Sequence, residues 1–181
     1  MSPTSHRLTG LVLFASLAFG CGPRLPEQLR FKGTDLAKTA EWKLEGVQSV
    51  VFVPEGESLR DSSLQVGILT STEHKTAREL NVWIMKQYRL ARVSREFESV
   101  SADTACKVGH TKIPNRDFVA VHLCREAPGF ALCVEADARI TAEMRNPSGD
   151  MQTHWDRVCT VQWDTYGAEL ETLARRLIAQ R

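Results

Sequence analysis

Two alternating segments joined by a short turn constrain this chain more than any other feature of its sequence. Asp117–Arg125 alternates apolar with other residues, and Phe130–Met144 does the same over a longer stretch. Side chains point to opposite faces along a strand, so both segments predict β-strands. If Ala-Pro-Gly-Phe at 127–130 is a four-residue turn, the two strands are adjacent and Cys124 lies opposite Cys133.

The longer strand is expected to have one apolar face and one charged face. Its apolar face carries Leu132, Val134 and the alternate residues that follow them. The other face carries a row of alternating charge, which is typical of a solvated sheet surface. That row is Glu135, Asp137 and Arg139.

Weaker patterns predict the remaining elements of the fold. Strands are expected at 47–53, 64–69, 90–97 and 151–163, a short helix at 101–108 and a turn at 146–149. A helix over 70–89 would begin at a capping box formed by Thr70 and Glu73. A closing helix carries an apolar stripe of Leu170, Leu173, Ala174, Leu177 and Ile178. Together they predict an α/β fold (an α+β sandwich): a mixed, largely antiparallel sheet with helices on one face.

The amino-terminal segment predicts export. Arg7 is followed by a 12-residue apolar stretch, Leu8–Phe19, the length of a signal-peptide core and too short to span a bilayer. The next residues, Ala18-Phe19-Gly20-Cys21, resemble the lipobox of bacterial lipoproteins, which implies cleavage before Cys21 and its acylation, for example with palmitate. The alternative is an ordinary signal-peptidase cut at the same bond, giving a secreted or soluble periplasmic protein.

The cysteine count agrees with a lipidated Cys21. The chain has five cysteines, so one thiol has no partner if all the others pair in an oxidising compartment. The strand register pairs Cys124 with Cys133, which leaves Cys106 for Cys159. The competing connectivities are 106–124 with 133–159, and 106–133 with 124–159.

These features predict three segments: a signal peptide at 1–20, a lipidated tether at 21–40 and a single periplasmic domain at 41–181. In the well-studied Gram-negative lipoproteins, Asp after the lipidated cysteine retains the protein in the inner membrane. Gly22 occupies that position here, so the resemblance implies the periplasmic face of the outer membrane.

Charge and motifs exclude several classes of function. Removing residues 1–20 leaves 22 basic and 22 acidic residues, so no basic excess exists to bind nucleic acid. The spacings Cys106-x3-His110 and His122-x-Cys124 match no common zinc framework, and no metal or other cofactor is expected. No hydrolase, nucleotide-binding or metalloprotease motif is present. The four tryptophans, 42, 83, 155 and 163, are expected in the core, with a carbohydrate-binding platform as the alternative.

The order of elements resembles the periplasmic lipoprotein domain of the curli-secretion type, an architecture shared with the TolB amino-terminal domain and with lipoprotein activators of penicillin-binding proteins. The resemblance covers about residues 45–181. In that family a hairpin turn is followed by a tryptophan, and here Asn146-Pro147-Ser148-Gly149 and Trp155 would occupy those places.

We therefore expect a non-enzymatic, membrane-anchored envelope lipoprotein that binds a periplasmic protein partner as an accessory or assembly factor. The alternative is an envelope enzyme or ligand-binding protein whose site assembles from scattered residues. The partner itself is not specified by the sequence.

Overall fold

The computed structural model describes residues 25–90, 94–112, 115–145 and 149–180. The signal peptide, Cys21 and most of the expected turn at 146–149 lie outside these ranges. The described residues form the strands β1 (Gln28–Phe31), β2 (Thr34–Leu44), β3 (Val47–Pro54), β4 (Leu64–Ser71), β5 (Ser94–Val100), β6 (Thr104–Lys112), β7 (Asn115–Ala127) and β8 (Phe130–Arg139), and the helices α1 (Ala77–Leu90) and α2 (Met151–Ala179).

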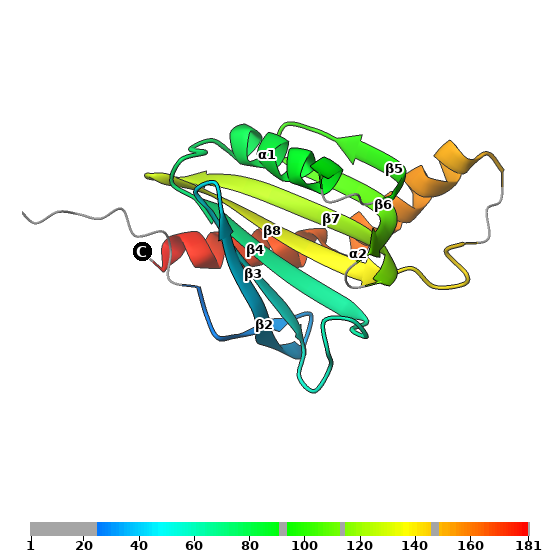
Figure 1. Cartoon of the computed structure of the whole chain (residues 1–181), viewed down its shortest axis with the longest axis horizontal. Helices are drawn as coiled ribbons and strands as arrows, with labels where there is room; N and C mark the ends of the chain where they lie inside the picture. Colours follow the sequence, from blue (N-terminus) through cyan, green and yellow to red (C-terminus); the bar gives the residue numbers. More distant parts are fainter. Residues whose placement is uncertain (1–24, 91–93, 113–114, 146–148, 181) are drawn as a thin grey trace, which may run out of the picture.

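All eight described strands belong to one sheet, in the order β1-β2-β3-β4-β8-β7-β6-β5. Every neighbouring pair is antiparallel, so the sheet is antiparallel throughout rather than mixed. The sheet consists of two four-stranded meanders that meet where β4 pairs with β8. β4 and β8, with β7, are therefore the central strands (Figure 1).

The first two hairpins turn through two-residue loops whose residues all have positive φ. Lys32 and Gly33 have φ of 49° and 76°, and Glu45 and Gly46 have φ of 47° and 72°. Two successive residues of positive φ are the signature of a type I′ turn, whose twist matches that of the strands. At Gly46 the positive φ favours glycine, and a Cβ atom there would also displace the Glu73 carboxyl group.

The two helices lie on opposite faces of the sheet, so the expectation of helices on one face is wrong. On β7 and β8, Leu123 and Val134 belong to the core beneath α2, whereas the alternate residues Cys124 and Cys133 belong to a second core beneath α1. Figure 1 shows α1 and α2 on either side of the central strands. The reason is that the central strands bury side chains on both faces and therefore need a cover on each.

The larger core lies between α2 and the sheet. Its largest fully buried side chains are Phe31, Leu36, Phe52, Ile68, Phe130, Leu132, Leu170 and Leu177. The smaller core, beneath α1, contains Val47, Ala77, Leu80, Trp83, Ile84 and the Cys124–Cys133 disulfide. The closing-helix stripe predicted from the sequence is thus packed on the sheet.

Residues 151–163 are the first half of α2, so the strand expected there is wrong. Asp150 caps this helix, because its side chain accepts a hydrogen bond from the Thr153 backbone N–H. The buried residues that follow have helical spacing: His154, Trp155, Val158, Cys159 and Gln162. With the strand absent, the hairpin that carried the resemblance to the curli-secretion type is also absent, and Trp155 lies on a helix.

The helix expected at 101–108 is also wrong. Residues 104–112 form β6, which lies between β5 and β7 in the sheet. Cys106 and Val108 point into the large core, whereas Lys107 points to the other face. The apolar residues are thus two apart, with the period of a strand.

The tether expected over 21–40 is wrong from Gln28 onward. Residues 28–31 and 34–44 form β1 and β2, the outer strands of the first meander. The apolar alternation of β2 is limited to Ala40, Trp42 and Leu44, and most of its side chains are exposed.

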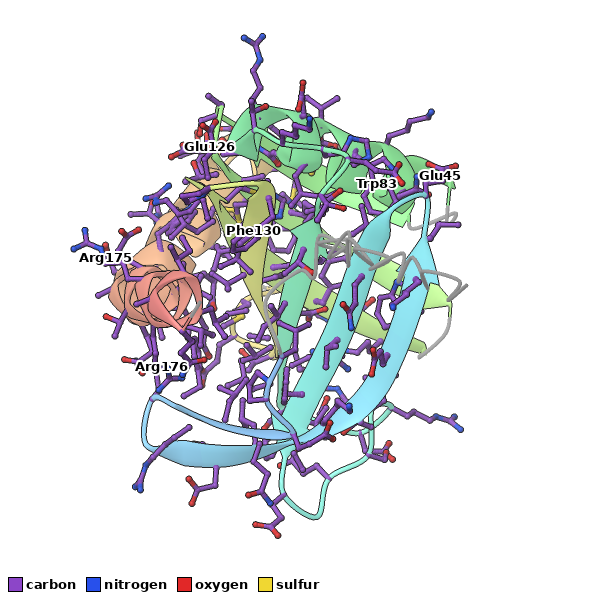
Figure 2. The ribbon with its side chains drawn as sticks, turned by 90° about the vertical axis from the view of Figure 1, so that its left-hand side faces the viewer. Glu45, Trp83, Glu126, Phe130, Arg175 and Arg176 are labelled. Carbon is purple, nitrogen blue, oxygen red and sulfur yellow. A yellow bond between two sulfur atoms is a disulfide. The ribbon has the colours of Figure 1, made fainter. Side chains whose placement is uncertain are left out.

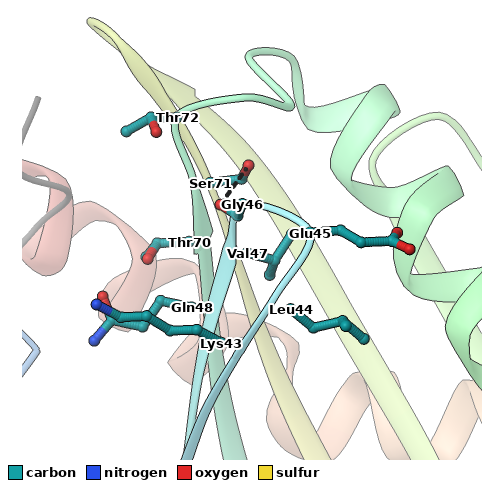
Figure 3. A pocket seen from close by; sticks show the side chains of 9 residues that line it. All are labelled: Lys43, Leu44, Glu45, Gly46, Val47, Gln48, Thr70, Ser71 and Thr72. Carbon is teal, nitrogen blue, oxygen red and sulfur yellow. Dashed lines mark hydrogen bonds between the residues drawn. The ribbon is translucent and has the colours of Figure 1, made fainter.

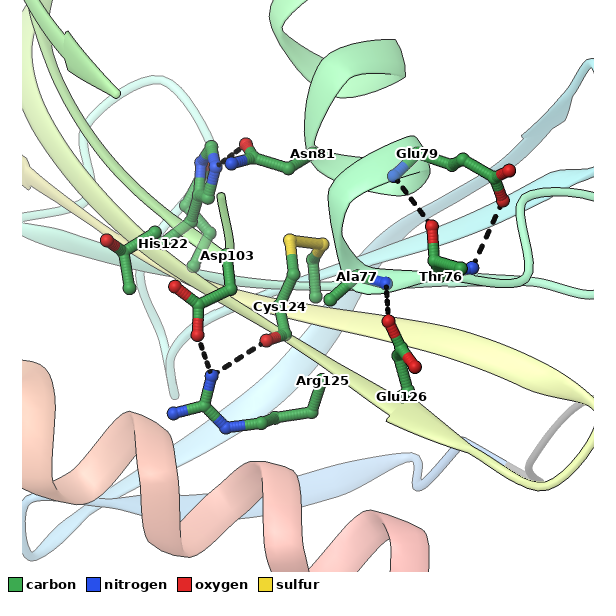
Figure 4. The surroundings of a disulfide bond; sticks show 12 residues. Thr76, Ala77, Glu79, Asn81, Asp103, His122, Cys124, Arg125 and Glu126 are labelled. Carbon is green, nitrogen blue, oxygen red and sulfur yellow. Dashed lines mark hydrogen bonds and ion pairs between the residues drawn. A yellow bond between two sulfur atoms is a disulfide. The ribbon is translucent and has the colours of Figure 1, made fainter. Parts of the chain in front are cut away.

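The residue that caps helix α1 lies six positions after the expected cap, Thr70. Thr70 and Ser71 are still in β4. The capping box is formed instead by Thr76 and Glu79: the Glu79 backbone N–H donates to Thr76 Oγ1, and the Thr76 backbone N–H donates to Glu79 Oε2. Figure 4 shows this exchange at the start of the helix.

Both disulfides have the connectivity derived from the register: Cys106–Cys159 and Cys124–Cys133. In the β7–β8 hairpin, Ala127 pairs with Phe130, so the loop is the two residues Pro128 and Gly129, and Cys124 pairs with Cys133 as expected. The second disulfide joins β6 to α2 rather than to a strand.

We expect Leu173→Ala to lower the free energy of unfolding by about 2–5 kcal/mol, because Leu173 is buried between α2 and the sheet. Urea denaturation followed by circular dichroism measures the change. The exposed Arg176 on the same helix (Figure 2) gives the control, and Arg176→Ala should change stability by about 0.5 kcal/mol or less. Equal effects of the two substitutions would contradict the assigned core.

Candidate functional site

Five ionisable side chains are buried together on the α1 face of the sheet. We call them the buried ion cluster: Lys107, Arg116, His122, Glu135 and Asp137. Each keeps less than a tenth of its surface exposed. The cluster comes from the three consecutive strands β6, β7 and β8.

Small neighbours on the same strands leave room for these long side chains. Glu135 pairs across the sheet with His122 on one side and with Gly67 on the other. Lys107 pairs with Ala120, and Ala120 in turn pairs with Asp137. Lys107 can therefore extend diagonally over Ala120 to reach Glu135.

Glu135 is the centre of the first group of contacts. Its Oε2 atom lies 2.8 Å from Lys107 Nζ and 3.4 Å from His122 Nδ1. On the other side of the imidazole, His122 Nε2 lies 2.6 Å from Asn81 Oδ1. A chain of polar contacts thus runs from β6 through β8 and β7 to helix α1.

The Asn81 side chain determines which histidine nitrogen carries the proton. Asn81 Nδ2 donates to the backbone carbonyl of Ser101 at 3.1 Å, so its Oδ1 atom faces His122 and must accept. His122 Nε2 is therefore the protonated nitrogen of the neutral ring. This contact fixes α1 against β7 and against the turn before β6 (Figure 4).

Arg116 is the centre of the second group. Its guanidinium donates to Asp137 Oδ1 at 3.0 Å and to Ser62 Oγ at 3.0 Å. Gln65 donates to the same Ser62 Oγ at 3.1 Å and to the Leu59 carbonyl at 2.6 Å. These bonds attach the loop between β3 and β4 to the far end of the cluster.

The pKa values of the cluster follow from burial and pairing. For Glu135, burial alone would raise the pKa, but the Lys107 ammonium holds it well below its usual range. Burial raises the pKa of Asp137 to about 7, against the opposing effect of Arg116. Burial lowers the pKa values of Lys107 and His122, and the Lys107 charge lowers that of His122 further.

The charged row expected on the solvated face of β8 is therefore wrong for two of its three members. Glu135 and Asp137 are buried, and only Arg139 is exposed. The signal that could have found them lies on the neighbouring strands, since Lys107, Arg116 and His122 offer the complementary charges. Recognising it would have required β6 to be identified as a strand.

Three surface recesses lie elsewhere. The first, of about 340 Å³, lies where the β2–β3 turn meets the end of β4 and is lined by Lys43–Gln48 and Thr70–Thr72 (Figure 3). The second, of about 380 Å³, lies beside the Cys106–Cys159 disulfide. The third, of about 240 Å³, lies between β1 and β2. None of these three is lined by a member of the buried ion cluster.

Exposed apolar side chains mark the surface beside the first recess. Trp42 and Leu44 on β2 are each 46% exposed, so Trp42 is not in the core as expected, whereas Trp83 and Trp155 are buried. Trp42 and Leu44 lie on the α1 face, because they pair with Ser49 and Val47 of β3. The turn beside them is attached to α1, since Trp83 Nε1 donates to Glu45 Oε2 at 2.9 Å (Figure 2).

The described part of the chain offers no cluster of three or more His, Cys, Asp or Glu side chains arranged to hold a metal ion. Within the same residues, neither helix is long and apolar enough to cross a membrane. Comparison with protein-family models, with curated proteins and with solved structures finds no match to this chain.

We expect Glu135→Gln to lower the free energy of unfolding at pH 7 by about 3–5 kcal/mol, because it leaves the buried Lys107 ammonium without its carboxylate. Adding Lys107→Met should recover most of that loss, since the double variant buries no unpaired charge. Chemical denaturation measures all three proteins, with the exposed Glu143→Gln as the control. Simple addition of the two single effects would contradict the pairing.

His122 makes stability depend on pH. Its pKa is lowered in the native state, so between pH 7 and 5 the unfolded chain takes up a proton that the native protein does not. As the pH falls through this window, this group alone lowers the stability by at most about 1.4 kcal/mol per pH unit. Asp137, whose pKa burial raises to about 7, has the opposite effect there, because the native protein rather than the unfolded chain takes up its proton. We expect His122→Gln to be less stable than the wild type at pH 7 but to lose less stability on acidification. Parallel slopes in urea unfolding at pH 5, 6 and 7 would contradict this assignment.

Proposed function

We propose that this protein is a non-enzymatic envelope lipoprotein, anchored by acylated Cys21 on the periplasmic face of the outer membrane. Its folded domain would bind a periplasmic protein as an accessory or assembly factor. The observation that carries the proposal is the use of the cysteines.

The two disulfides use Cys106, Cys124, Cys133 and Cys159, which leaves Cys21 as the one cysteine outside a disulfide. Disulfides of this kind persist in exported proteins rather than in the reducing cytosol. A cysteine that follows a signal-peptide core, in a chain whose other thiols are all paired, fits the acyl acceptor of a lipoprotein.

The start of the domain supports attachment close to a membrane. Leu25 is partly buried against the large core, and only three residues separate it from Cys21. Four fully extended peptide units span roughly 14 Å. An acylated Cys21 would therefore hold the domain at the bilayer surface, and its partner would meet it there.

The exposed surface of β2 supports a role in binding protein. Trp42 and Leu44 lie two residues apart on the same face of the strand and are each about half exposed. Large apolar side chains grouped at a surface are more common at interaction sites than elsewhere. Glu45, in the turn beside Leu44, gives that surface a polar edge.

We expect Cys21→Ser to abolish acylation and to release the protein from the membrane. Cells fed with an alkyne-labelled palmitate would report acylation, and fractionation of the envelope would report location. Because the substitution lies outside the folded domain, the melting temperature should not change. A wild-type protein that takes up no label would overturn the proposed anchor.

The neighbouring position tests the destination separately. Gly22→Asp should leave acylation intact and move the protein from the outer-membrane to the inner-membrane fraction, whereas Gly22→Ala should move nothing. An unchanged distribution of the Asp variant would contradict outer-membrane sorting by this signal while leaving the anchor in place.

A further inference from the structure

The carboxyl-terminal half of β2 is an open edge of the sheet. β1 pairs only with residues 34–37, and the Lys38 backbone N–H donates to the Glu27 carbonyl just beyond. From Thr39 to Leu44, β2 has β3 on one side and no described strand on the other. An edge of this kind presents unpaired backbone N–H and C=O groups to any strand that can match it.

The chain that precedes β1 does not cover this edge within the described residues. Pro26 has no backbone N–H to donate, so the pairing with β2 cannot continue regularly through it. Leu25 packs against the large core, which lies on the α2 face of the sheet. Within the described residues, Leu25 and Pro26 therefore do not extend the pairing along β2.

The charges along the edge are arranged to match themselves. Glu41 and Lys43 lie on the α2 face, since they pair with Val50 and Gln48 of β3. In an antiparallel pair of two β2 strands centred on Trp42, Glu41 of each copy lies opposite Lys43 of the other. Opposite charges in directly facing positions stabilise a strand pair, and like charges destabilise it.

The same alignment matches the apolar residues on the other face. Trp42 faces Trp42 of the second copy, and Ala40 faces Leu44. Aromatic cross-strand pairs are among the favourable ones. The half-exposed Trp42 and Leu44 would both be covered in such a pair.

The two adjacent alignments of the edges are unfavourable. Centring the pair on Lys43 places Lys43 opposite itself and Glu41 opposite Glu45. Centring it on Glu41 places that carboxylate opposite itself. Charges on edge strands commonly prevent indiscriminate pairing. Of the three alignments centred on residues 41, 42 and 43, only the one centred on Trp42 avoids placing like charges opposite each other.

We propose that two copies of this protein pair antiparallel through the free edge of β2, centred on Trp42, and form one continuous sheet. The contact is isologous, so it closes at a dimer and does not propagate. It does not depend on the proposed anchor at Cys21, so failure of either idea leaves the other standing. It does use the Trp42 and Leu44 surface proposed for protein binding, and it names a second copy of the chain as the protein bound there.

Cysteine cross-linking in the full chain tests the alignment. Trp42→Cys should give a covalent dimer on non-reducing gels of oxidised envelopes, because directly opposed positions lie about 4.5–5.5 Å apart. Leu44→Cys alone should give none, since position 44 faces position 40, whereas the double variant Ala40→Cys, Leu44→Cys should cross-link. The exposed Val161→Cys on α2 controls for random collision.

Cross-linking also distinguishes the other occupants of this edge. A Trp42→Cys adduct to a different protein would overturn pairing with a second copy. Cross-linking of Leu44→Cys at the level of Trp42→Cys would overturn the alignment, and cross-linking of none of the four variants would overturn the dimer.

A charge exchange gives an independent test. Glu41→Lys and Lys43→Glu should each weaken dimerisation of the purified full chain by about tenfold or more, because each places like charges opposite each other twice. The double exchange Glu41→Lys, Lys43→Glu restores opposite charges and should return the dissociation constant to within about threefold of the wild type. Sedimentation velocity measures it, and unchanged melting temperatures control for folding. A monomer at every concentration, or a double variant as weak as the single ones, would overturn the proposal.

Discussion

Strand β8 is buried along both of its faces from Phe130 to Ala138, and the rest of the molecule depends on that constraint. On one face its side chains are apolar and pack beneath α2. On the other face they are Cys133, Glu135 and Asp137, which cannot be buried unless each is bonded or paired. The neighbouring strands supply the partners: Cys124 to the first and basic side chains to the other two.

The buried ion cluster is better understood as a means of positioning than as a source of stability. Burying an ion pair gains little over apolar packing, but breaking one is costly, so such pairs select one arrangement against others. Here the selected arrangement is the position of α1, because Asn81 on the helix meets His122 on β7. A slip of α1 by one turn would leave that imidazole without its partner. Beneath the start of α1, the Cys124–Cys133 disulfide joins β7 to β8 (Figure 4).

The sequence predicts the central hairpin well because two independent signals agree there. Strict alternation defines the faces, and Pro128-Gly129 fixes the register, so the position of Cys124 opposite Cys133 follows from both.

The strand prediction for residues 151–163 fails because the signals there disagree. Trp155, Val161 and Trp163 are spaced evenly enough to suggest a strand, yet the buried set has helical spacing and Val161 is exposed. Tertiary packing decides between the two periods, and the sequence alone does not contain that packing. β2 was missed because its apolar alternation is limited to Ala40, Trp42 and Leu44, although Glu45-Gly46 carried the turn signal.

The candidate surfaces were harder to predict than the fold, since they depend on which face of the sheet each helix covers. With both helices on the α2 face, Glu135 would be solvated. With a helix on each face, burial extends to Glu135 and leaves Trp42 at an open edge.

The placement of one helix on each face also orients the proposed lipoprotein. Leu25 packs against the core beneath α2, and the carboxyl-terminal end of α2 lies beside the first described residues (Figure 1). An anchor at Cys21 would therefore be attached to the domain close to that helix. Trp42 and Leu44 lie on the opposite, α1 face. In a protein held to the bilayer by so short a connection, Trp42 and Leu44 would thus lie on the face opposite α2. On that face they would be accessible to another protein in the periplasm.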